Sequence, residues 1–261
     1  MLPSEKYKGK VVLITGGTKG IGLGIAEGFL LAGAKVVVCG RQDVESLPQV
    51  IVDKEIRKAH FIQADVKDID STAAMFKAIT QEYGKLDVLI NNAGGSPFAL
   101  ADKASPRFHE AILKLNLIAP LNVAQQANQI MQANDGGSII FISSISAMRA
   151  SPGTAAYGAA KAGILSLVQS LAVEWAPKVR TMAVSPGLVK TENSHLHYGD
   201  DDGIAAVSAT IPAGRMAEPE DITNACLFLA SPEASYSSGC NLLLNGGGEM
   251  PAFLNASEES K

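Results

Sequence analysis

The chain has 261 residues, of which 47% are hydrophobic and 18% charged, and its formal net charge is -4. This balance is typical of a globular protein that buries a sizeable core, so long disordered segments are not expected. The negative charge argues against a nucleic-acid groove or an anionic membrane surface, because both attract clustered positive charge.

Short apolar and β-branched runs recur along the chain and predict seven strands, at 10–15, 34–40, 60–64, 86–91, 138–143, 179–185 and 241–244. Their near-continuous apolar character indicates strands that are covered on both faces, as in a parallel sheet. Helical periodicity between them predicts helices at 20–32, 70–83, 107–133, 155–175 and 218–230. Strands that alternate with helices predict an α/β fold, a Rossmann-like doubly wound sheet with helices on both faces. Because no linker or repeat divides the chain, we expect one domain over residues 1–261.

A glycine-rich turn, TGGTKGIG at 15–22, follows the first predicted strand and opens the first predicted helix. Glycines let the backbone approach a pyrophosphate, and the helix N-terminus offers unpaired N–H groups. The spacing differs from the common GxGxxG, and a tight turn without a ligand is the alternative, but the strand-turn-helix context favours a dinucleotide site. Its candidate residues are Gly16, Thr18, Lys19, Gly20, Ile21 and Gly22.

The end of the second predicted strand indicates which dinucleotide binds. An acidic residue there would bond the ribose 2′-OH and exclude a 2′-phosphate, but the sequence has Gly40 followed by Arg41. Arg41 and Lys19 together suit a phosphate, so we expect NADP(H) in preference to NAD(H). The alternative is that both residues are solvated surface cations.

Two segments interrupt the alternation of strands and helices. Residues 192–216 are too long for a connecting turn and predict a substrate lid. Within them, Asp200, Asp201 and Asp202 predict a solvated helix start. In the tail at 249–261 we expect the apolar first half to dock on the protein and the charged end to fray.

Five spaced motifs resemble those of the short-chain dehydrogenase/reductase family, namely TGGTKGIG, NNAG at 91–94, Ser144, YGAAK at 157–161 and SPG at 185–187. The resemblance extends from residue 8 to residue 248 and implies a single-domain Rossmann-fold oxidoreductase that acts on alcohols and carbonyls with NAD(P). It implies that Tyr157 is the catalytic acid/base with Lys161 as its partner. It further implies that Ser144 positions the substrate and that Asn116 kinks its helix and holds a water in a proton relay.

The same resemblance implies contacts with the cofactor along the chain. Asp65 and Val66 match the pair that meets the adenine, and Asn92 and Gly94 match residues beside the adenosine ribose. Four further residues match the segment that receives the nicotinamide and its carboxamide, namely Pro186, Gly187, Val189 and Thr191.

The tyrosine and the lysine of YGAAK pose a question of acidity, because both have ordinary pKa values of about 10. Tyr157 and Lys161 are four positions apart and so share one helix face. An ammonium close to a phenol favours phenolate, so we expect a lowered Tyr157 pKa. An oxidised nicotinamide would add a second positive charge and favour phenolate further. Taken alone, YxxxK could equally be two surface polar residues of an amphipathic helix with no catalytic role. The other motifs argue against this alternative.

The substrate is expected to lie between the segment after NNAG, residues 146–149 and the lid, in an apolar pocket. Candidate lining residues are Phe98, Ala147, Met148, Leu196 and Ile204. Aspartates 200–202 at the entrance would discourage a highly anionic substrate, which places an apolar secondary alcohol slightly ahead of a 3-oxoacyl thioester. A catalytically silent cofactor-binding regulator is the competing class of function, and the four intact catalytic residues argue against it.

Three features depart from the usual family pattern, one of which is EWAPKVR at 174–180, one residue short of the usual turn. Met182 stands where an asparagine is common, and NGGG at 245–248 replaces a common DGG. We expect these changes to affect turn geometry and subunit contacts and to leave the chemistry intact. The resemblance implies a homotetramer or homodimer assembled through the helices at 107–133 and 155–175.

The remaining features indicate location and metal content. Cys39, Cys226 and Cys240 have no metal or redox spacing and are expected to be free thiols. His195 and His197 form an HxH with no third ligand in view, so we expect no metal site. No apolar run reaches the length of a membrane span, and the polar N-terminus leads to no signal-peptide core, so we expect a cytoplasmic enzyme.

Overall fold

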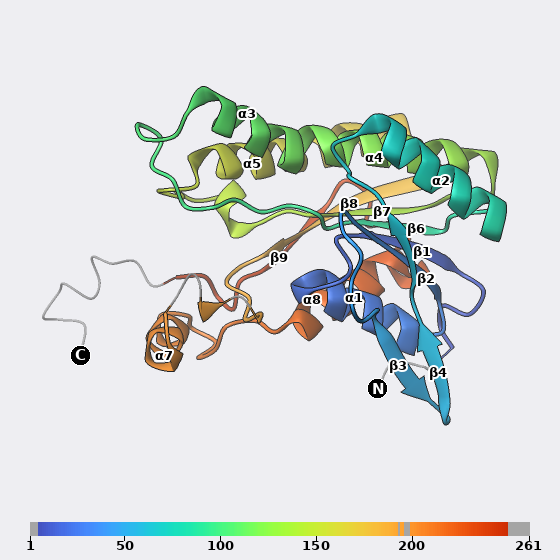
Figure 1. The fold of residues 1–261 in the computed structure, drawn as a ribbon, viewed down its shortest axis with the longest axis horizontal. Coiled ribbons are helices and arrows are strands. Elements are labelled where there is room, and N and C mark those ends of the chain that lie inside the picture. The colour runs from blue at the N-terminus through green and yellow to red at the C-terminus, as the bar shows by residue number, and fades with distance from the viewer. Residues whose placement is uncertain (1–4, 193, 196–198, 250–261) are drawn as a thin grey trace, which may run out of the picture.

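A seven-stranded parallel sheet forms the centre of the fold, seen here in a computed structural model that describes residues 5–192, 194–195 and 199–249 (Figure 1). The strand order is β5-β2-β1-β6-β7-β8-β9, and every neighbouring pair is parallel. All seven predicted strands are present, and the predicted fold class is confirmed. The strands are β1 (Val11–Thr15), β2 (Lys35–Gly40), β5 (His60–Gln63), β6 (Val88–Asn91), β7 (Gly137–Ile142), β8 (Val179–Pro186) and β9 (Asn241–Leu244).

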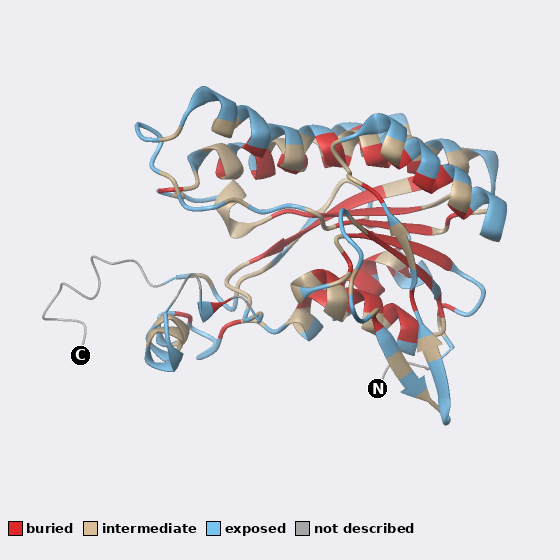
Figure 2. Ribbon diagram, viewed as in Figure 1, coloured by how far each residue is buried: buried red, intermediate tan, exposed pale blue. Residues whose placement is uncertain are grey.

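Helices cover both faces of this sheet, with α2, α4 and α5 on one face and α1 and α8 on the other (Figure 1). Each face has its own buried apolar cluster, and the sides of the helices that face the sheet are buried (Figure 2). The helices are α1 (Gly20–Leu31), α2 (Ile69–Tyr83), α3 (Pro106–Leu113), α4 (Ala119–Ala133), α5 (Ala155–Glu174), α7 (Asp201–Ala209) and α8 (Pro219–Ala230). Short 3₁₀ turns lie at Ile145–Ala147 and Pro232–Ala234.

Helices α1 and α8 pack unusually close together. A Cβ on Gly28 would lie 2.2 Å from Cγ2 of Thr223, and a Cβ on Gly24 would lie 2.7 Å from Cβ of Pro219. Such distances are too short for any side chain, so glycine at both positions sets the separation of the two helices. The helix that follows the glycine-rich turn is therefore braced by a helix from the C-terminal part of the chain.

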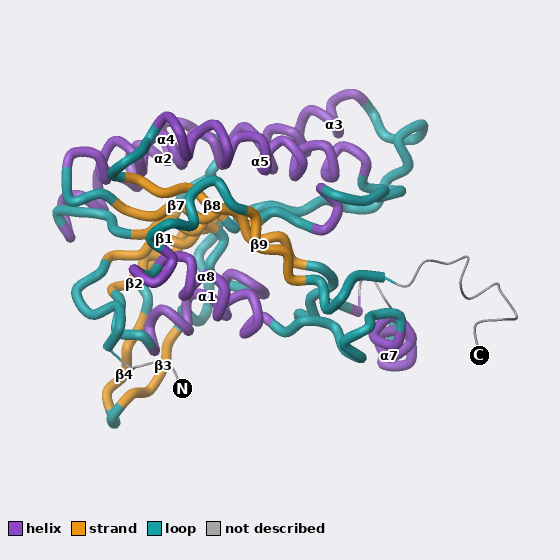
Figure 3. Tube along the Cα trace, turned by 180° about the vertical axis from the view of Figure 1, so that it is seen from behind, coloured by secondary structure: helices purple, strands orange, loops and turns teal. Residues whose placement is uncertain are grey.

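The sequence did not predict the antiparallel hairpin of β3 (Gln49–Val52) and β4 (Glu55–Lys58). It projects away from the main sheet near the N-terminus (Figure 3). Its turn places Asp53 and Lys54 at positive φ, 51° and 71°, a conformation that glycine or asparagine adopts more readily. The opposed residues Ile51 and Ile56 are both exposed.

One helix within the described ranges, α5, is long and apolar enough by composition to cross a membrane. It lies on the central sheet, where Ile164, Val168 and Leu171 join the buried cluster of that face. Core helices of globular proteins commonly have this composition.

Candidate active site

Three predicted catalytic residues converge where β7 ends and α5 begins. Lys161 Nζ donates a 2.8 Å hydrogen bond to the carbonyl of Ile142, the last residue of β7. Ser143 Oγ donates 3.0 Å to the carbonyl of Lys161, so α5 is fastened to the strand end at two points. Ser144 follows directly and hydrogen-bonds the Tyr157 side chain, which places serine, tyrosine and lysine side by side.

Lys161 is almost completely buried, with 4% of its surface exposed. Burial disfavours the ammonium and lowers its pKa from 10.5 to about 8. Its Nζ lies over the Tyr157 ring, 5.5 Å from the ring centroid. A cation over an aromatic face is attracted by the ring quadrupole, which partly offsets the cost of burial.

The expected lowering of the Tyr157 pKa is wrong for the protein alone. Burial raises the pKa of the phenol above its ordinary 10, and the hydrogen bond with Ser144 lowers it by less. The desolvation of a phenolate therefore outweighs the nearby cation. The lysine therefore does not by itself generate a phenolate near neutral pH.

Asn116 lies in a π-helical turn, Lys114–Ile118, that interrupts the single helix predicted at 107–133 and separates α3 from α4. Its buried side chain accepts a 2.8 Å bond from the Gly95 amide and donates to the carbonyls of Gly95 (3.0 Å) and Ile112 (2.9 Å). Both amide donors are thus engaged. The asparagine holds the loop after β6 against the helix on which it lies.

Gly94 is the point where this loop meets both Asn116 and Lys161. A Cβ on Gly94 would lie 2.7 Å from Asn116 Oδ1 and 3.3 Å from Lys161 Nζ. A larger residue would displace one of the two polar groups. The structure thus brings together Gly94 of NNAG, Asn116, and the tyrosine and lysine of YGAAK.

The nucleotide end is built from the loops after β1 and β6. Thr15 Oγ1 accepts 3.0 Å hydrogen bonds from the amides of Asn92 and Ala93. The Asn92 side chain in turn donates to the carbonyls of Thr15 (3.0 Å) and Gly16 (3.1 Å). Asn92 therefore acts on the glycine-rich turn directly, by fixing its first carbonyl groups.

The glycine-rich turn has the geometry that a bound pyrophosphate needs. Gly16 and Gly20 have positive φ, 65° and 52°, and a Cβ on Gly22 would lie 2.2 Å from the Gly16 carbonyl oxygen. Lys19, the N-cap of α1, makes no side-chain hydrogen bond to the helix. The first N–H groups of α1 therefore remain available to an anion, so these residues fit a dinucleotide phosphate.

The residues predicted at the adenosine end lie at the carboxyl ends of β2 and β5. Arg41 and Lys19 are both exposed, and the Arg41 carbonyl accepts a 2.9 Å bond from Gln63. Asp65 accepts from the Lys67 amide at 3.0 Å, which orders the turn after β5, and Val66 packs on the adjacent core cluster. These positions are consistent with the predicted contacts, which stay predictions.

The predicted nicotinamide segment follows β8. The Gly187 amide donates 2.8 Å to the Leu244 carbonyl, and Val189 bridges to Ala217. Thr191 approaches the glycine-rich turn, since a Cβ on Gly20 would lie 3.6 Å from its Cγ2. The predicted nicotinamide segment thus lies beside the predicted pyrophosphate turn.

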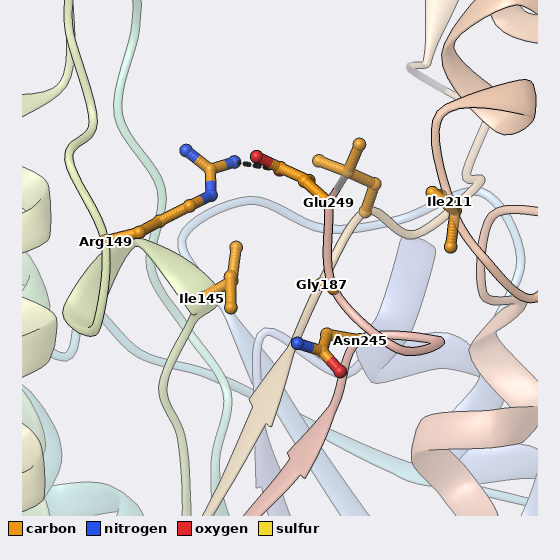
Figure 4. Close-up of a pocket in the computed structure, with 8 residues that line it drawn as sticks. Ile145, Arg149, Gly187, Ile211, Asn245 and Glu249 are labelled. Atoms are coloured by element: carbon orange, nitrogen blue, oxygen red, sulfur yellow. Dashed lines mark ion pairs between the residues drawn. The ribbon is translucent and has the colours of Figure 1, made fainter. Parts of the chain in front are cut away.

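A pocket of about 270 Å³ opens beside these residues, at the carboxyl ends of β7, β8 and β9 (Figure 4). It differs from the predicted apolar pocket. Phe98 is 71% exposed and lies against Gly153, and Leu196 lies outside the described residues. The pocket is lined by Ile145, Arg149, Gly187, Leu188, Ile211, Asn245, Gly248 and Glu249, so Ala147, Met148 and Ile204 are absent from its wall as well.

Five of these lining residues were not predicted from the sequence, namely Ile145, Leu188, Asn245, Gly248 and Glu249. Asn245 belongs to NGGG, for which we expected effects on turn geometry and subunit contacts, and it also lines the pocket. That this change leaves the chemistry intact stays a prediction. Glu249 begins the predicted tail and pairs with Arg149. The departure from DGG was the one available signal, and nothing in the sequence connected it to a pocket.

Within the described residues, no group of three or more His, Cys, Asp or Glu side chains could hold a metal. His195 Nδ1 pairs with the Glu192 carbonyl at 3.0 Å, and His197 lies outside the described ranges. The three cysteines are free thiols, as predicted. Asp200 caps α7 by accepting from the Gly203 amide, which confirms the predicted helix start.

Comparisons with known proteins agree over nearly the whole chain. A family model described as enoyl-(acyl carrier protein) reductase matches residues 16–249. A 3α-hydroxysteroid dehydrogenase of Mediterraneibacter gnavus is 36% identical over 92% of this chain and 96% of that protein. A 2-dehydro-3-deoxy-D-gluconate 5-dehydrogenase of Pseudoalteromonas atlantica is 34% identical over 95% and 98%, and a 3-oxoacyl-[acyl-carrier-protein] reductase of Vibrio cholerae is 36% identical over 92% and 97%.

Solved structures agree with the sequence relatives. The ligand-free aldohexose dehydrogenase of Thermoplasma acidophilum superposes with a TM-score of 0.84 at 30% identity, over 94% of this chain and 95% of that one. A short-chain alcohol dehydrogenase from Sinorhizobium meliloti, described as putative in its own report, gives a TM-score of 0.83 over 94% and 98%. The substrates named for these proteins are a hydroxysteroid, a sugar acid, a 3-oxoacyl-[acyl-carrier-protein] and an aldohexose.

Proposed function

Starting from the finding that this chain belongs to the short-chain dehydrogenase/reductase family of NAD(P)-dependent oxidoreductases, we propose that Tyr157 is its catalytic acid/base. The reaction transfers a hydride between a nicotinamide cofactor and a secondary alcohol or ketone. The observation that carries the proposal is the meeting of Ser144, Tyr157 and Lys161 where β7 ends and α5 begins. A panel of alcohols and ketones, assayed with NADPH and NADH at the nicotinamide absorbance, tests it.

The side chains divide the work of carbonyl reduction among them. Ser144 donates a hydrogen bond to the substrate oxygen on which negative charge develops. Tyr157, held as a neutral phenol by burial, gives its proton to that oxygen. The nicotinamide supplies the hydride when it is bound.

Lys161 completes the proton path behind the tyrosine. Its pKa of about 8 allows it to gain and lose a proton near the working pH. Asn116 has no side-chain donor left, since both amide hydrogens are used by Gly95 and Ile112. A relay water at this residue would therefore have to bind an acceptor oxygen of Asn116, not its side-chain N–H groups.

We propose NADP(H) as the preferred cofactor. Arg41 follows β2 directly, and no carboxylate occupies the place that would bond a ribose 2′-OH. Lys19 lies in the glycine-rich turn, and both cations are exposed and able to reach a phosphate.

A 3-oxoacyl thioester reductase is the second candidate function, favoured by the name of the Vibrio cholerae relative. The pocket's volume of about 270 Å³ lies near the lower limit for ligand pockets, so it suits a small group better than a long acyl chain. We further propose that residues 192–216 form the substrate lid, because Ile211 from this segment lines the pocket.

The remaining proposals concern the whole protein. One sheet draws strands from residue 11 to residue 244, which supports a single domain over residues 1–261. Leu113 and Ile118 are exposed beside α5, which supports a dimer or tetramer formed through α3, α4 and α5. Three free thiols support a cytoplasmic location, where disulfides are rare.

A further inference from the structure

An ion pair between Arg149 and Glu249 joins two segments that line the pocket (Figure 4). The Arg149 side chain comes from the turn after β7, and the Glu249 side chain comes from the segment after β9. One guanidinium nitrogen lies 2.7 Å from the Glu249 carboxylate, and the other donates 2.9 Å to the carbonyl of Ala150. The Glu249 carboxylate therefore contacts one nitrogen of the guanidinium, and the pair lacks the two parallel hydrogen bonds of a bidentate contact.

This pair is easily exchanged for another anion. Its side chains are 36% and 41% exposed, and exposed pairs gain little net free energy because water and salt screen them. Guanidinium binds a free carboxylate best through two parallel hydrogen bonds, which a flexible small ligand can arrange more readily than a tethered glutamate.

Arg149 lies on the turn that follows Ser144, the residue expected to position the substrate. The pocket wall begins at Ile145, the residue directly after Ser144, and continues along the same turn to Arg149. Ser144 and Arg149 thus lie on the same turn, five positions apart in the chain, and the pocket wall begins next to Ser144. Gly187, at the predicted nicotinamide segment, also lines the pocket.

We propose that Arg149 binds a carboxylate of the substrate, and that Glu249 occupies this place when no substrate is bound. The substrate class is then a small hydroxy acid or the corresponding oxo acid. This inference rests on the proposed oxidoreductase function and replaces the expectation of an apolar substrate. Aspartates 200–202, which would oppose it, are absent from the pocket lining.

The pocket's dimensions and polarity fit this class. Its volume of about 270 Å³ lies near the lower limit for small-molecule sites, and Asn245 adds an amide that can bond a hydroxyl or a carboxylate oxygen. Arg149 is the one cation among its lining residues in the part of the chain that the structure describes.

The test compares acids with their own esters. Four probes, 3-oxobutanoate and 4-oxopentanoate with their methyl esters, are reduced by the wild type and by Arg149→Gln, Arg149→Lys and Glu249→Gln. We expect the wild type to favour the acids and Arg149→Gln to lose about tenfold or more in kcat/KM on them while changing little on the esters. Glu249→Gln should lower KM for the acids, since it removes the competing carboxylate, and Arg149→Lys should recover part of the loss.

A second ion pair on another face provides the matched control. Arg57 pairs with Glu5 at 2.9 Å and also donates to a backbone carbonyl, that of Leu30. Arg57→Gln and Glu5→Gln should leave the ratio of acid to ester unchanged. Melting temperatures of all variants separate a folding defect from a change in specificity.

The outcomes distinguish this inference from the function on which it rests. Equal losses on acids and esters in Arg149→Gln, or a wild type that favours the esters, would overturn the role of Arg149 while leaving the oxidoreductase function intact. Absence of turnover on these probes and on the wider panel of alcohols and ketones would overturn both. A raised KM for the acids in Glu249→Gln would contradict the exchange of Glu249 for substrate.

Discussion

The ammonium of Lys161 lies over the ring of Tyr157, 5.5 Å from its centroid, and its hydrogen bond goes to the carbonyl of Ile142. The lysine thus holds the end of β7 and the face of the tyrosine together. In the protein alone, burial keeps the phenol protonated. The formation of phenolate, which alcohol oxidation requires, therefore depends on positive charge beyond that of the lysine.

Tyr157→Phe should abolish turnover and preserve cofactor binding, because it removes the hydroxyl and keeps the ring under Lys161. Loss of a general acid/base typically lowers kcat by about 10²- to 10⁴-fold. Initial rates and fluorescence titration with NADPH measure the two quantities. Tyr236→Phe, at a fully exposed tyrosine, is the control, and activity of Tyr157→Phe within a few-fold of the wild type would reject the assignment.

Lys161 should give stability a characteristic pH dependence. Burial lowers its pKa from 10.5 to about 8, so between these values the unfolded chain keeps a proton that the folded protein has lost. The destabilisation is full below pH 8 and disappears above pH 10.5, so the free energy of unfolding rises across this window, by up to about 3 kcal/mol.

Urea unfolding of the wild type and of Lys161→Met at about pH 7.5 and about pH 10 isolates this contribution, because other titrating groups cancel in the difference. The wild type should gain stability relative to the variant as the pH rises. A difference that stays constant would show that Lys161 titrates normally.

Arg41→Asp should reverse the preference for cofactor. The new carboxylate repels a 2′-phosphate and can bond a ribose 2′-OH. We expect KM for NADPH to rise by about tenfold to hundredfold, the value of a charge-assisted hydrogen bond, and KM for NADH to stay equal or fall. Lys77→Asp on α2 makes the same change of charge at an exposed site and should have no effect. An unchanged preference in Arg41→Asp would defeat the NADP(H) proposal.

Ala162→Arg should dissociate the assembly. Ala162 lies on the exposed face of α5, where small residues permit close helix packing and a long cation would prevent it. Light scattering should show a dimer or tetramer for the wild type and a smaller species for the variant. Ala73→Arg, the same substitution on the exposed face of α2, should leave the mass unchanged. A monomeric wild type would contradict the proposed interface.

The seven strands were predictable because buried parallel strands are nearly continuous apolar runs, such as Val11–Thr15. The hairpin of β3 and β4 was not, because its turn residues, Asp53 and Lys54, adopt positive φ without a glycine. The π turn at Asn116 was equally hidden, since the helical periodicity of residues 107–133 continues through it.

The candidate site was predictable where a motif is local and unpredictable where a contact is distant. Ser144, Tyr157 and Lys161 meet because β7 leads into α5, an arrangement that the family motifs encode. The contact of Arg149 with Glu249 joins two loops far apart in the chain, so no motif or residue spacing in the sequence predicts it. The direction of the Tyr157 pKa was missed for a similar reason, because desolvation depends on neighbours that sequence distance does not reveal.

The close contact of α1 with α8 has a consequence for how the protein matures. Gly24 and Gly28 leave a groove into which Pro219 and Thr223 of α8 pack, and those residues are synthesised after more than four-fifths of the chain. A nascent chain that ends before α8 has the complete glycine-rich turn but lacks the support behind it. The ability to hold a dinucleotide should therefore arise late and abruptly during translation, when the last helix reaches the first.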